Sequence, residues 1–142
     1  MTDYISDIKG WFELAVPTPN DKNRAVQIGV HFEEVAEMLE ATNHWSPCLR
    51  DDLADIANKF KKHHAGVGTN EVDRTELLDA LCDQIVTAVG VAHMFGMDIE
   101  GALTEVTRSN WSKFVDGKPV FDANGKIAKP PSYSKPDLTL FV

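Results

Sequence analysis

The chain has 142 residues, 43% of them hydrophobic, a formal net charge of −8 and two cysteines. This length and composition suit one soluble globular domain, and no apolar run approaches the roughly 20 residues of a membrane span. The acidic balance argues against a nucleic-acid-binding protein. The first residues lack the features of a signal peptide, and the two cysteines show neither a redox nor a zinc spacing, so we expect a reduced, cytoplasmic setting.

Helical periodicity dominates the first four-fifths of the sequence. Apolar residues three and four positions apart predict a helix over 4–15, which Pro17 ends. Asn20 is a suitable N-cap for a longer second helix over about 21–42. A third helix is expected over about 49–63. The connecting segments are then a break at 45–47 and a loop at 65–70.

A fourth helix is predicted over about 73–95, and its aliphatic residues are dense enough for a central, largely buried position. Gly96 closes this helix. Asp98 caps a fifth helix over about 99–114, which ends before the Asp116-Gly117 pair.

The remaining residues lose the helical pattern. Four prolines follow residue 115, and the Asn-Gly pair at 124–125 is flanked by short apolar pairs, so a small hairpin is expected there within an extended loop. The prediction is one all-α domain over 1–142. It consists of a bundle of about five helices (1–114) and an irregular C-terminal tail (115–142).

Charge is distributed unevenly between these two parts. From Lys113 onward the chain has five lysines and three aspartates, a net charge of +2, so the remainder carries −10. A basic tail beside an acidic body can supply cations to a bound phosphate chain. The alternative is a solvated tail whose lysines only aid solubility.

Two acidic clusters at helical spacing are the main candidates for chemistry. Residues three or four positions apart lie on one helix face, where carboxylates repel each other unless a cation lies between them. Hard oxygen ligands suit Mg²⁺ or Mn²⁺, which are common partners of nucleotide phosphates. The first cluster is Glu33, Glu34, Glu37 and Glu40, and the second is Glu76, Asp79 and Asp83.

Ordinary solvated helix faces are the alternative explanation of these clusters. Against it, no lysine or arginine occurs in residues 25–49, and Asp83 lies in a strongly apolar stretch where an unpaired carboxylate is costly. A di-iron site would need Glu-x-x-His pairs, and none of the five histidines follows a glutamate at that spacing. Phosphate-bond chemistry assisted by divalent metal is therefore the leading hypothesis.

A series of motifs carries a family resemblance. In order, these are EEVAE at 33–37, ELLDALCD at 76–83, GMD at 96–98, SNWSK at 109–113, and a tail with DGK, GK, KPPSY and PDL. Over residues 24–138 the chain resembles the MazG-like, all-α nucleoside triphosphate pyrophosphohydrolases. Within them it is most similar to the branch of phosphoribosyl-ATP pyrophosphohydrolase and the dimeric dUTPase-like enzymes.

The resemblance implies a hydrolase that cleaves a (deoxy)nucleoside triphosphate into the monophosphate and pyrophosphate. It implies Mg²⁺ or Mn²⁺, with two or more ions per site, and a homodimer or homotetramer in the cytoplasm, or in the host cytoplasm if the chain is phage-encoded. We favour a purine deoxynucleotide such as dGTP. The alternatives are a house-cleaning enzyme for dUTP or dCTP, a phosphoribosyl-ATP pyrophosphohydrolase, and a non-catalytic acidic oligomerisation module.

The resemblance also implies roles for individual residues. Glu34, Glu37 and Asp83 match metal ligands. Ala80 stands where the family has a glutamate, so we expect Asp79 to complete the set, with Glu76 as the second choice. Glu33 and Glu34 orient the attacking water, and Lys113 stabilises the departing pyrophosphate. The residues expected to contact substrate phosphates are Asn110, Lys113, Lys118, Lys126, Lys129 and Tyr133.

Two aromatic residues of the first predicted helix have two open interpretations. Trp11 and Phe12 can stack on the nucleobase, as aromatic side chains do, or they can anchor the core. Trp111 replaces the methionine that is usual in the SNWSK-type motif.

Overall fold

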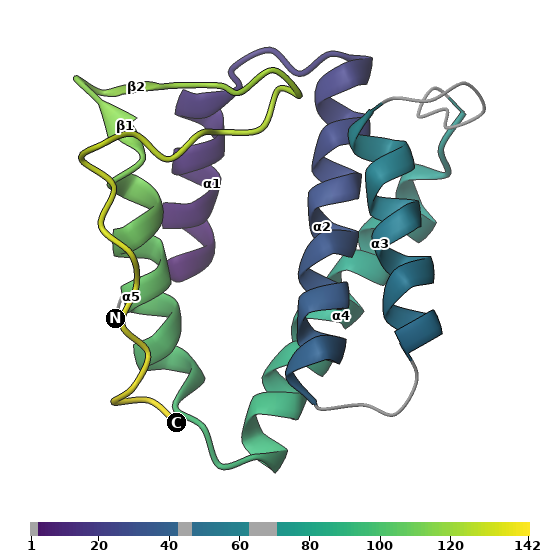
Figure 1. Ribbon diagram of the computed structural model, residues 1–142, viewed down its shortest axis with the longest axis vertical. Helices are drawn as coiled ribbons and strands as arrows, with labels where there is room; N and C mark the ends of the chain where they lie inside the picture. Colours follow the sequence, from purple (N-terminus) through teal and green to yellow (C-terminus); the bar gives the residue numbers. More distant parts are fainter. Residues whose placement is uncertain (1–2, 43–46, 63–70) are drawn as a thin grey trace. The chain divides into compact units, whose positions relative to one another are not determined.

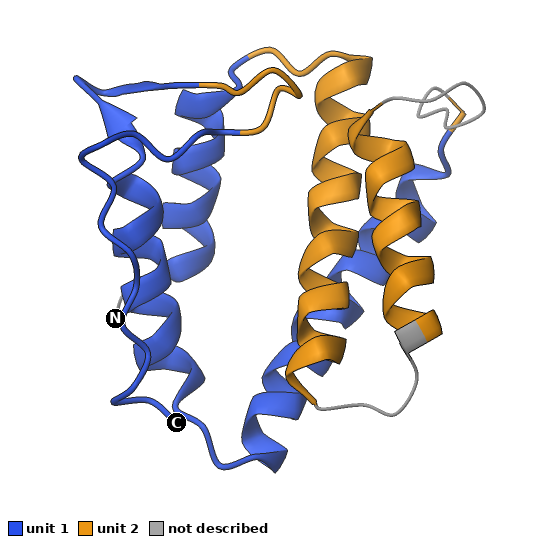
Figure 2. Ribbon diagram, viewed as in Figure 1, with its two compact units in different colours: residues 1–17, 72–120, 127–142 blue, residues 18–71, 121–126 orange. Residues whose placement is uncertain are grey.

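The computed structural model describes residues 3–42, 47–62 and 71–142, without the side chain of Pro47. In these residues the chain forms five α-helices and a two-stranded antiparallel sheet (Figure 1), which confirms the predicted all-α class. The contacts divide the chain into two compact units (Figure 2): unit 1 contains 1–17, 72–120 and 127–142, and unit 2 contains 18–71 and 121–126. The predicted tail therefore contributes to both units.

Unit 2 is built on the helix pair α2 (Asp21–Ala41) and α3 (Pro47–Lys61). Asn20 caps α2 as predicted: its side chain accepts the Asn23 N–H at 2.8 Å, and the Asn23 side chain accepts the Asn20 N–H at 3.0 Å. α3 begins two residues earlier than expected because proline is well suited to the first helical position. The predicted end at residue 63, the break at 45–46 and the loop at 65–70 lie outside the described residues.

The two helices of unit 2 approach each other closely along small residues. An ideal Cβ on Gly29 of α2 would lie only 2.6 Å from the carbonyl oxygen of Ala57 on α3. Only glycine fits such an approach of backbone to backbone. Ala25, Ala36 and Ala57 are also buried in this unit.

Unit 1 contains α1 (Tyr4–Ala15), α4 (Arg74–Met94) and α5 (Ile99–Trp111). Trp11 of α1 is 9% exposed, and its indole N–H donates to the carbonyl oxygen of Asn110 at 3.0 Å. Its ring centroid lies 4.9 Å from that of Phe12 and 5.5 Å from that of Phe114. This aromatic cluster joins the first helix to the end of α5.

The predicted pairing around Asn124-Gly125 is confirmed: the Asp122 N–H donates to the Lys126 carbonyl at 2.8 Å, and the Ala128 N–H donates to the Val120 carbonyl at 2.7 Å. The two-stranded sheet lies before this turn in the sequence. Strands β1 (Phe114–Val115) and β2 (Lys118–Pro119) pair across Asp116 and Gly117, which have φ values of 51° and 71°. Two successive positive φ values match the turn that a two-residue hairpin favours. Because β1 begins at Phe114, α5 ends at Trp111, three residues before the predicted end.

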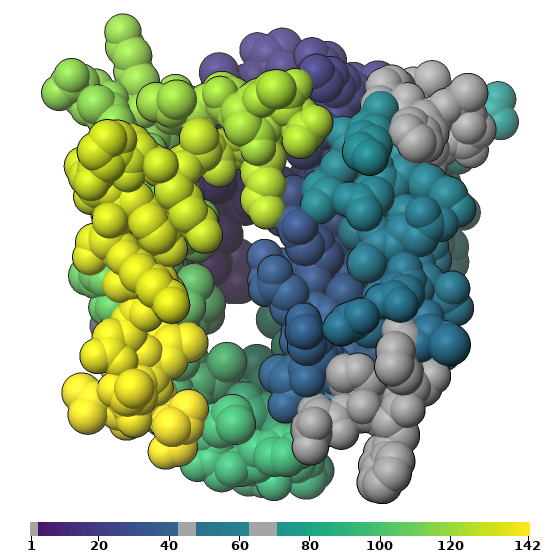
Figure 3. Space-filling model, viewed as in Figure 1, coloured from purple at the N-terminus to yellow at the C-terminus, as the bar shows by residue number. Residues whose placement is uncertain are grey.

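Residues 133–141, which we term the C-terminal strap, run along α5. The Ser134 N–H donates to Ser112 Oγ at 2.8 Å, the Asp137 N–H to Glu105 Oε1 at 3.0 Å, and the Asp98 N–H to the Phe141 carbonyl at 2.8 Å. In the space-filling view the yellow strap covers the green α5 (Figure 3). The strap is thus fastened from one end of α5 to the other.

The strap is fastened to an ion-paired carboxylate of α5. Arg108 donates to both oxygens of Glu105 at 2.7 Å. The hydrogen bonds from Arg108 and from the Asp137 N–H lower the pKa of Glu105 to about 2. Glu105 therefore remains a carboxylate acceptor for the strap at any physiological pH.

α4 corrects one expectation, because it is exposed rather than largely buried. Among its large apolar side chains, Leu78 is 64% exposed, Ile85 53%, Val86 67% and Met94 81%, and Ala92 is its one buried residue. The dense aliphatic pattern of α4 therefore does not correspond to burial among the described residues, and the prediction of a largely buried helix is wrong. α4 corrects a second expectation as well: with 21 residues it is long and apolar enough, by length and composition only, to cross a membrane, although the sequence suggested no such segment.

Candidate functional site

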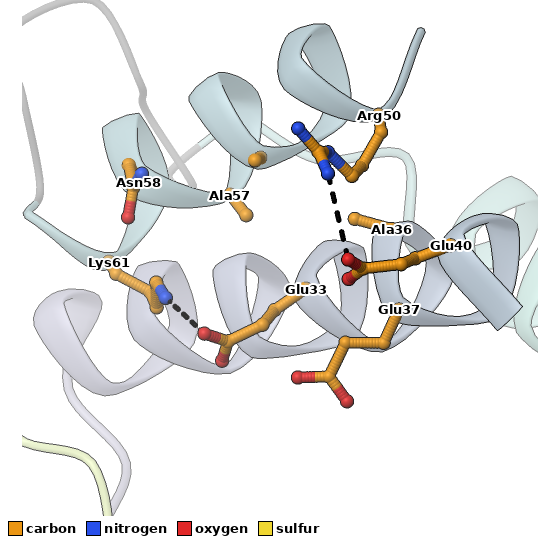
Figure 4. A pocket seen from close by; sticks show the side chains of 9 residues that line it. Glu33, Ala36, Glu37, Glu40, Arg50, Ala57, Asn58 and Lys61 are labelled. Atoms are coloured by element: carbon orange, nitrogen blue, oxygen red, sulfur yellow. Dashed lines mark hydrogen bonds and ion pairs between the residues drawn. The ribbon is translucent and has the colours of Figure 1, made fainter. Parts of the chain in front are cut away.

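The acidic face of α2 opens onto a groove in unit 2 (Figure 4). The groove has a volume of about 250 Å³ and is lined by carboxylates from α2 and by cations from α3. Its charged lining residues are Glu33, Glu37, Glu40, Arg50 and Lys61, and its remaining lining residues are Ala36, Ala54, Ala57 and Asn58.

Glu33 is held between two lysines. Lys61 of α3 donates to Glu33 Oε1 and Lys126 of the tail donates to Glu33 Oε2, both at 2.7 Å. Burial alone would raise the pKa of Glu33, but the hydrogen bonds from Lys126 and Lys61 outweigh it and hold the pKa below the usual value. Glu33 is therefore a fixed, charge-compensated carboxylate.

The other α2 carboxylates are arranged differently. Glu40 lies 3.6 Å from an Arg50 nitrogen, whereas the Glu37 side chain points away from α3 (Figure 4). Glu34 and Glu37 are exposed and three residues apart on α2. They offer hard oxygen donors on one side of the helix, as the prediction of metal ligands requires.

The second acidic cluster belongs to unit 1. Glu76, Asp79 and Asp83 are all exposed on α4. Asp73 caps this helix by accepting the N–H groups of Thr75 and Glu76 at 3.0 and 3.1 Å. The two predicted rows of carboxylates therefore lie in different compact units.

The donor chemistry of each row suits Mg²⁺ or Mn²⁺, but neither row is a complete protein cage. Within each unit, the described residues contain no group of three or more His, Cys, Asp or Glu side chains placed to hold one ion. Mg²⁺ commonly uses one or two carboxylates and completes its shell with water and substrate phosphates. The pair of Glu34 and Glu37 fits that mode of binding.

A cationic cluster forms at the end of α5 in unit 1. The ammonium groups of Lys113 and Lys129 lie 5.9 and 5.3 Å from the centroid of the Tyr133 ring. Lys113 donates to Asn110 Oδ1 at 2.8 Å, and the buried Ser109 donates to the Tyr133 hydroxyl at 3.4 Å. Four of the six predicted phosphate-contacting residues are thus side by side, and two of them are cations.

The remaining predicted contacts are more scattered. Lys118 is exposed on β2, and Lys126 lies in unit 2 on Glu33. Trp11 is buried against Asn110, so the core-anchor interpretation describes its ring, whereas Phe12 is 37% exposed. Trp11 therefore fixes the backbone at Asn110, three residues before Lys113.

Two cations that line the groove, Arg50 and Lys61, were not among the predicted residues. They are eleven residues apart on α3, which is three helical turns, so they lie on one face. This spacing was the available signal. Their pairing with Glu40 and Glu33 could have been inferred only by knowing that α3 packs against the acidic face of α2.

Comparison with known proteins returned no similarity: no family model, no curated protein and no solved structure matches this chain. The MazG-like resemblance therefore stays a prediction based on the motifs themselves.

Proposed function

We propose that the chain is a metal-dependent pyrophosphohydrolase of (deoxy)nucleoside triphosphates. The observation that carries the proposal is the cluster of Asn110, Lys113, Lys129 and Tyr133, which gathers two ammonium groups on one aromatic ring. Such a cluster suits an anion with several charges, and a triphosphate chain meets that description.

Carboxylates complete the requirements of the reaction. Glu34 and Glu37 of unit 2 are the residues of α2 that would hold Mg²⁺ or Mn²⁺, and Asp79, Asp83 and Glu76 are the corresponding residues of α4. When bound, the metal supplies charge neutralisation at the phosphates and activation of water.

The side chains of the chain itself have separable roles in this proposal. Lys113 and Lys129 compensate the negative charge that accumulates on the leaving pyrophosphate. Asn110 orients Lys113 through the 2.8 Å hydrogen bond, and the Tyr133 ring contacts both ammonium groups. In this proposal Glu34 accepts a proton from the attacking water.

The direct test is product analysis. The purified chain is incubated with each deoxynucleoside triphosphate and with Mg²⁺ or Mn²⁺, and the released phosphorus species are identified. We expect pyrophosphate and a monophosphate, with dGTP as the preferred substrate over dUTP and dCTP. Release of inorganic phosphate alone would show that a different bond is cleaved.

A matched pair of variants tests the role of the α2 carboxylates. Glu37→Gln is expected to lower kcat by at least about a hundredfold, because one of the two α2 carboxylates that would hold the metal is lost. Glu13→Gln removes the same charge from an exposed surface pair with Lys9 and should leave kcat unchanged. Equal rates in the two variants, with native helix content by circular dichroism, would remove Glu37 from the site.

The exposed face of α4 favours a second candidate function, self-association without catalysis. Leu77, Leu81 and Ile85 share one face of α4. Asp79 and Asp83 each follow a leucine of that face by two residues, a rotation of about 200°, so both carboxylates lie on the opposite side of the helix. A second copy of the chain can therefore cover the apolar face while the carboxylates stay in water. This candidate predicts a dimer or tetramer that cleaves no triphosphate.

Light scattering of the intact chain tests the association. Ile85→Lys places a charge in the apolar face and should yield a monomer, whereas Gln84→Lys, its neighbour at the edge of that face, should keep the native mass. A wild-type monomer would refute self-association. Co-sedimentation with lipid vesicles by the wild type, lost in Ile85→Lys, would show that a membrane covers α4 instead.

A further inference from the structure

The tail places one lysine on α2 by means of a self-contained turn. In the segment 122–126, the Asp122 N–H donates to the Lys126 carbonyl at 2.8 Å, and the Gly125 N–H donates to the Asp122 carbonyl at 3.0 Å. The Asp122 carboxylate accepts the N–H groups of Asn124 and Lys126 at 2.9 and 3.0 Å. Gly125 has φ of 80°, which this turn requires. The turn is therefore built independently of the carboxylate that Lys126 reaches.

The two lysines on Glu33 differ in how they are held. Lys61 belongs to α3, where its backbone nitrogen lies 2.8 Å from an ideal Cβ at Gly29, and its side chain is 17% exposed. Lys126 is 42% exposed and reaches Glu33 only through the turn. Packing of α3 against α2 therefore fixes Lys61, whereas Lys126 can leave without disturbing either helix.

The charges of the three groups indicate which kind of ligand would open the contact. One carboxylate faces two ammonium groups, so the trio Glu33, Lys61 and Lys126 has one positive charge in excess. When Lys126 departs, Lys61 still compensates Glu33, and no half-buried charge is left unpaired. A cation that displaced the lysines from Glu33 would instead have to expel two ammonium groups. An anion that takes Lys126 is thus the favoured way to open the contact.

We propose that the Asp122–Lys126 turn is a releasable latch, closed by the contact of Lys126 with Glu33 and opened by a polyphosphate anion that binds Lys126. The closed latch competes with the anion for the same ammonium group. Apparent affinity for the anion is therefore reduced by the fraction of molecules that are closed. The proposal rests on the proposed function only in its choice of opening ligand.

Cross-linking measures the latch with an internal control. A water-soluble carbodiimide joins a carboxylate to an amine in direct contact, and both lysines lie 2.7 Å from Glu33. The full chain is treated without divalent metal, with or without inorganic triphosphate, and cross-linked peptides are quantified by mass spectrometry. We expect triphosphate to reduce the Glu33–Lys126 product severalfold and to preserve the Glu33–Lys61 product. Sodium chloride at the same ionic strength should preserve both.

Calorimetry of triphosphate binding supplies the second readout. Glu33→Gln frees Lys126 and should tighten binding about two- to fivefold, the range expected for an ion pair of this exposure. Glu40→Gln removes the same charge from the same helix, where Glu40 faces Arg50 instead, and should change affinity less than twofold. Equal tightening in both variants would mean general electrostatics and would overturn the latch.

Several outcomes distinguish the latch from the proposed function. A chain that cleaves nucleoside triphosphates while the Glu33–Lys126 product is insensitive to triphosphate has no such latch. A chain that shows both expected responses but cleaves no triphosphate retains the latch and refutes the enzyme. Failure of triphosphate to bind at all would overturn the latch.

Discussion

The substitution Trp11→Phe tests how the end of α5 is fixed. It removes the indole N–H that donates to the Asn110 carbonyl at 3.0 Å. Because Trp11 is only 9% exposed, the smaller ring also leaves an unfilled space beside Phe114. The lost hydrogen bond is worth about 1 kcal/mol and the lost packing about 1–2 kcal/mol. We expect the free energy of unfolding to fall by about 2–3 kcal/mol.

Trp111→Phe is the matched control within the same chain. Trp111 also contacts Phe114, at 5.4 Å between ring centroids, but its indole N–H donates at 3.2 Å to the exposed Asp7 carboxylate. Its loss should cost less than about 1 kcal/mol, because water replaces an exposed hydrogen bond.

Urea unfolding followed by far-ultraviolet circular dichroism compares the two variants. The midpoint should fall clearly for Trp11→Phe and little for Trp111→Phe, with unchanged slopes. Midpoints equal within error would refute the assignment of Trp11 as the anchor of α5.

Three further predictions follow from close packing and charge. Gly29→Ala should destabilise the α2–α3 pair by about 2 kcal/mol in urea unfolding, whereas Gly10→Ala, which meets no atom within 4 Å, should stabilise the protein by about 0.5–1 kcal/mol. The pKa of Glu33 is lowered from 4.5, so its contribution is complete above pH 4.5 and is lost as the pH falls below it; Glu33→Gln should flatten this acid limb of stability. Gly101→Ala would place a Cβ 2.5 Å from the Phe141 ring, so hydrogen exchange of the Asp98 amide should accelerate about tenfold or more.

Local signals predicted the helices well. Asn20 and Asp98 cap helices as expected, since capping depends on neighbours two or three residues away. Asp73, where the fourth helix was expected to begin, is its N-cap. Gly96 follows the end of the fourth helix with φ of 72°, a left-handed conformation that glycine adopts without strain. Such features can be read from a few adjacent residues.

Features that depend on distant partners could not be predicted in the same way. Glu33 finds Lys61 and Lys126, which are 28 and 93 residues away, and no spacing rule connects them. The exposure of α4 likewise depends on which distant residues pack against it. The aliphatic pattern of α4 predicts that a partner covers the helix, but it does not identify that partner.

The structure brings some of the predicted site residues together and leaves others apart. Asn110, Lys113, Lys129 and Tyr133 gather in unit 1, because SNWSK ends α5 and the strap returns along that helix. The metal role of the carboxylates stays a prediction. The cations Arg50 and Lys61 were missed, although their eleven-residue spacing on α3 carried a signal.

The C-terminal strap has a practical consequence for protein engineering. Its fastening to α5 relies on main-chain groups at Ser134, Asp137 and Phe141, which a separate peptide would also possess. The chain therefore meets the requirements for fragment complementation. A body ending near residue 132 and a short synthetic peptide should reassemble, which would turn this helix into a split reporter.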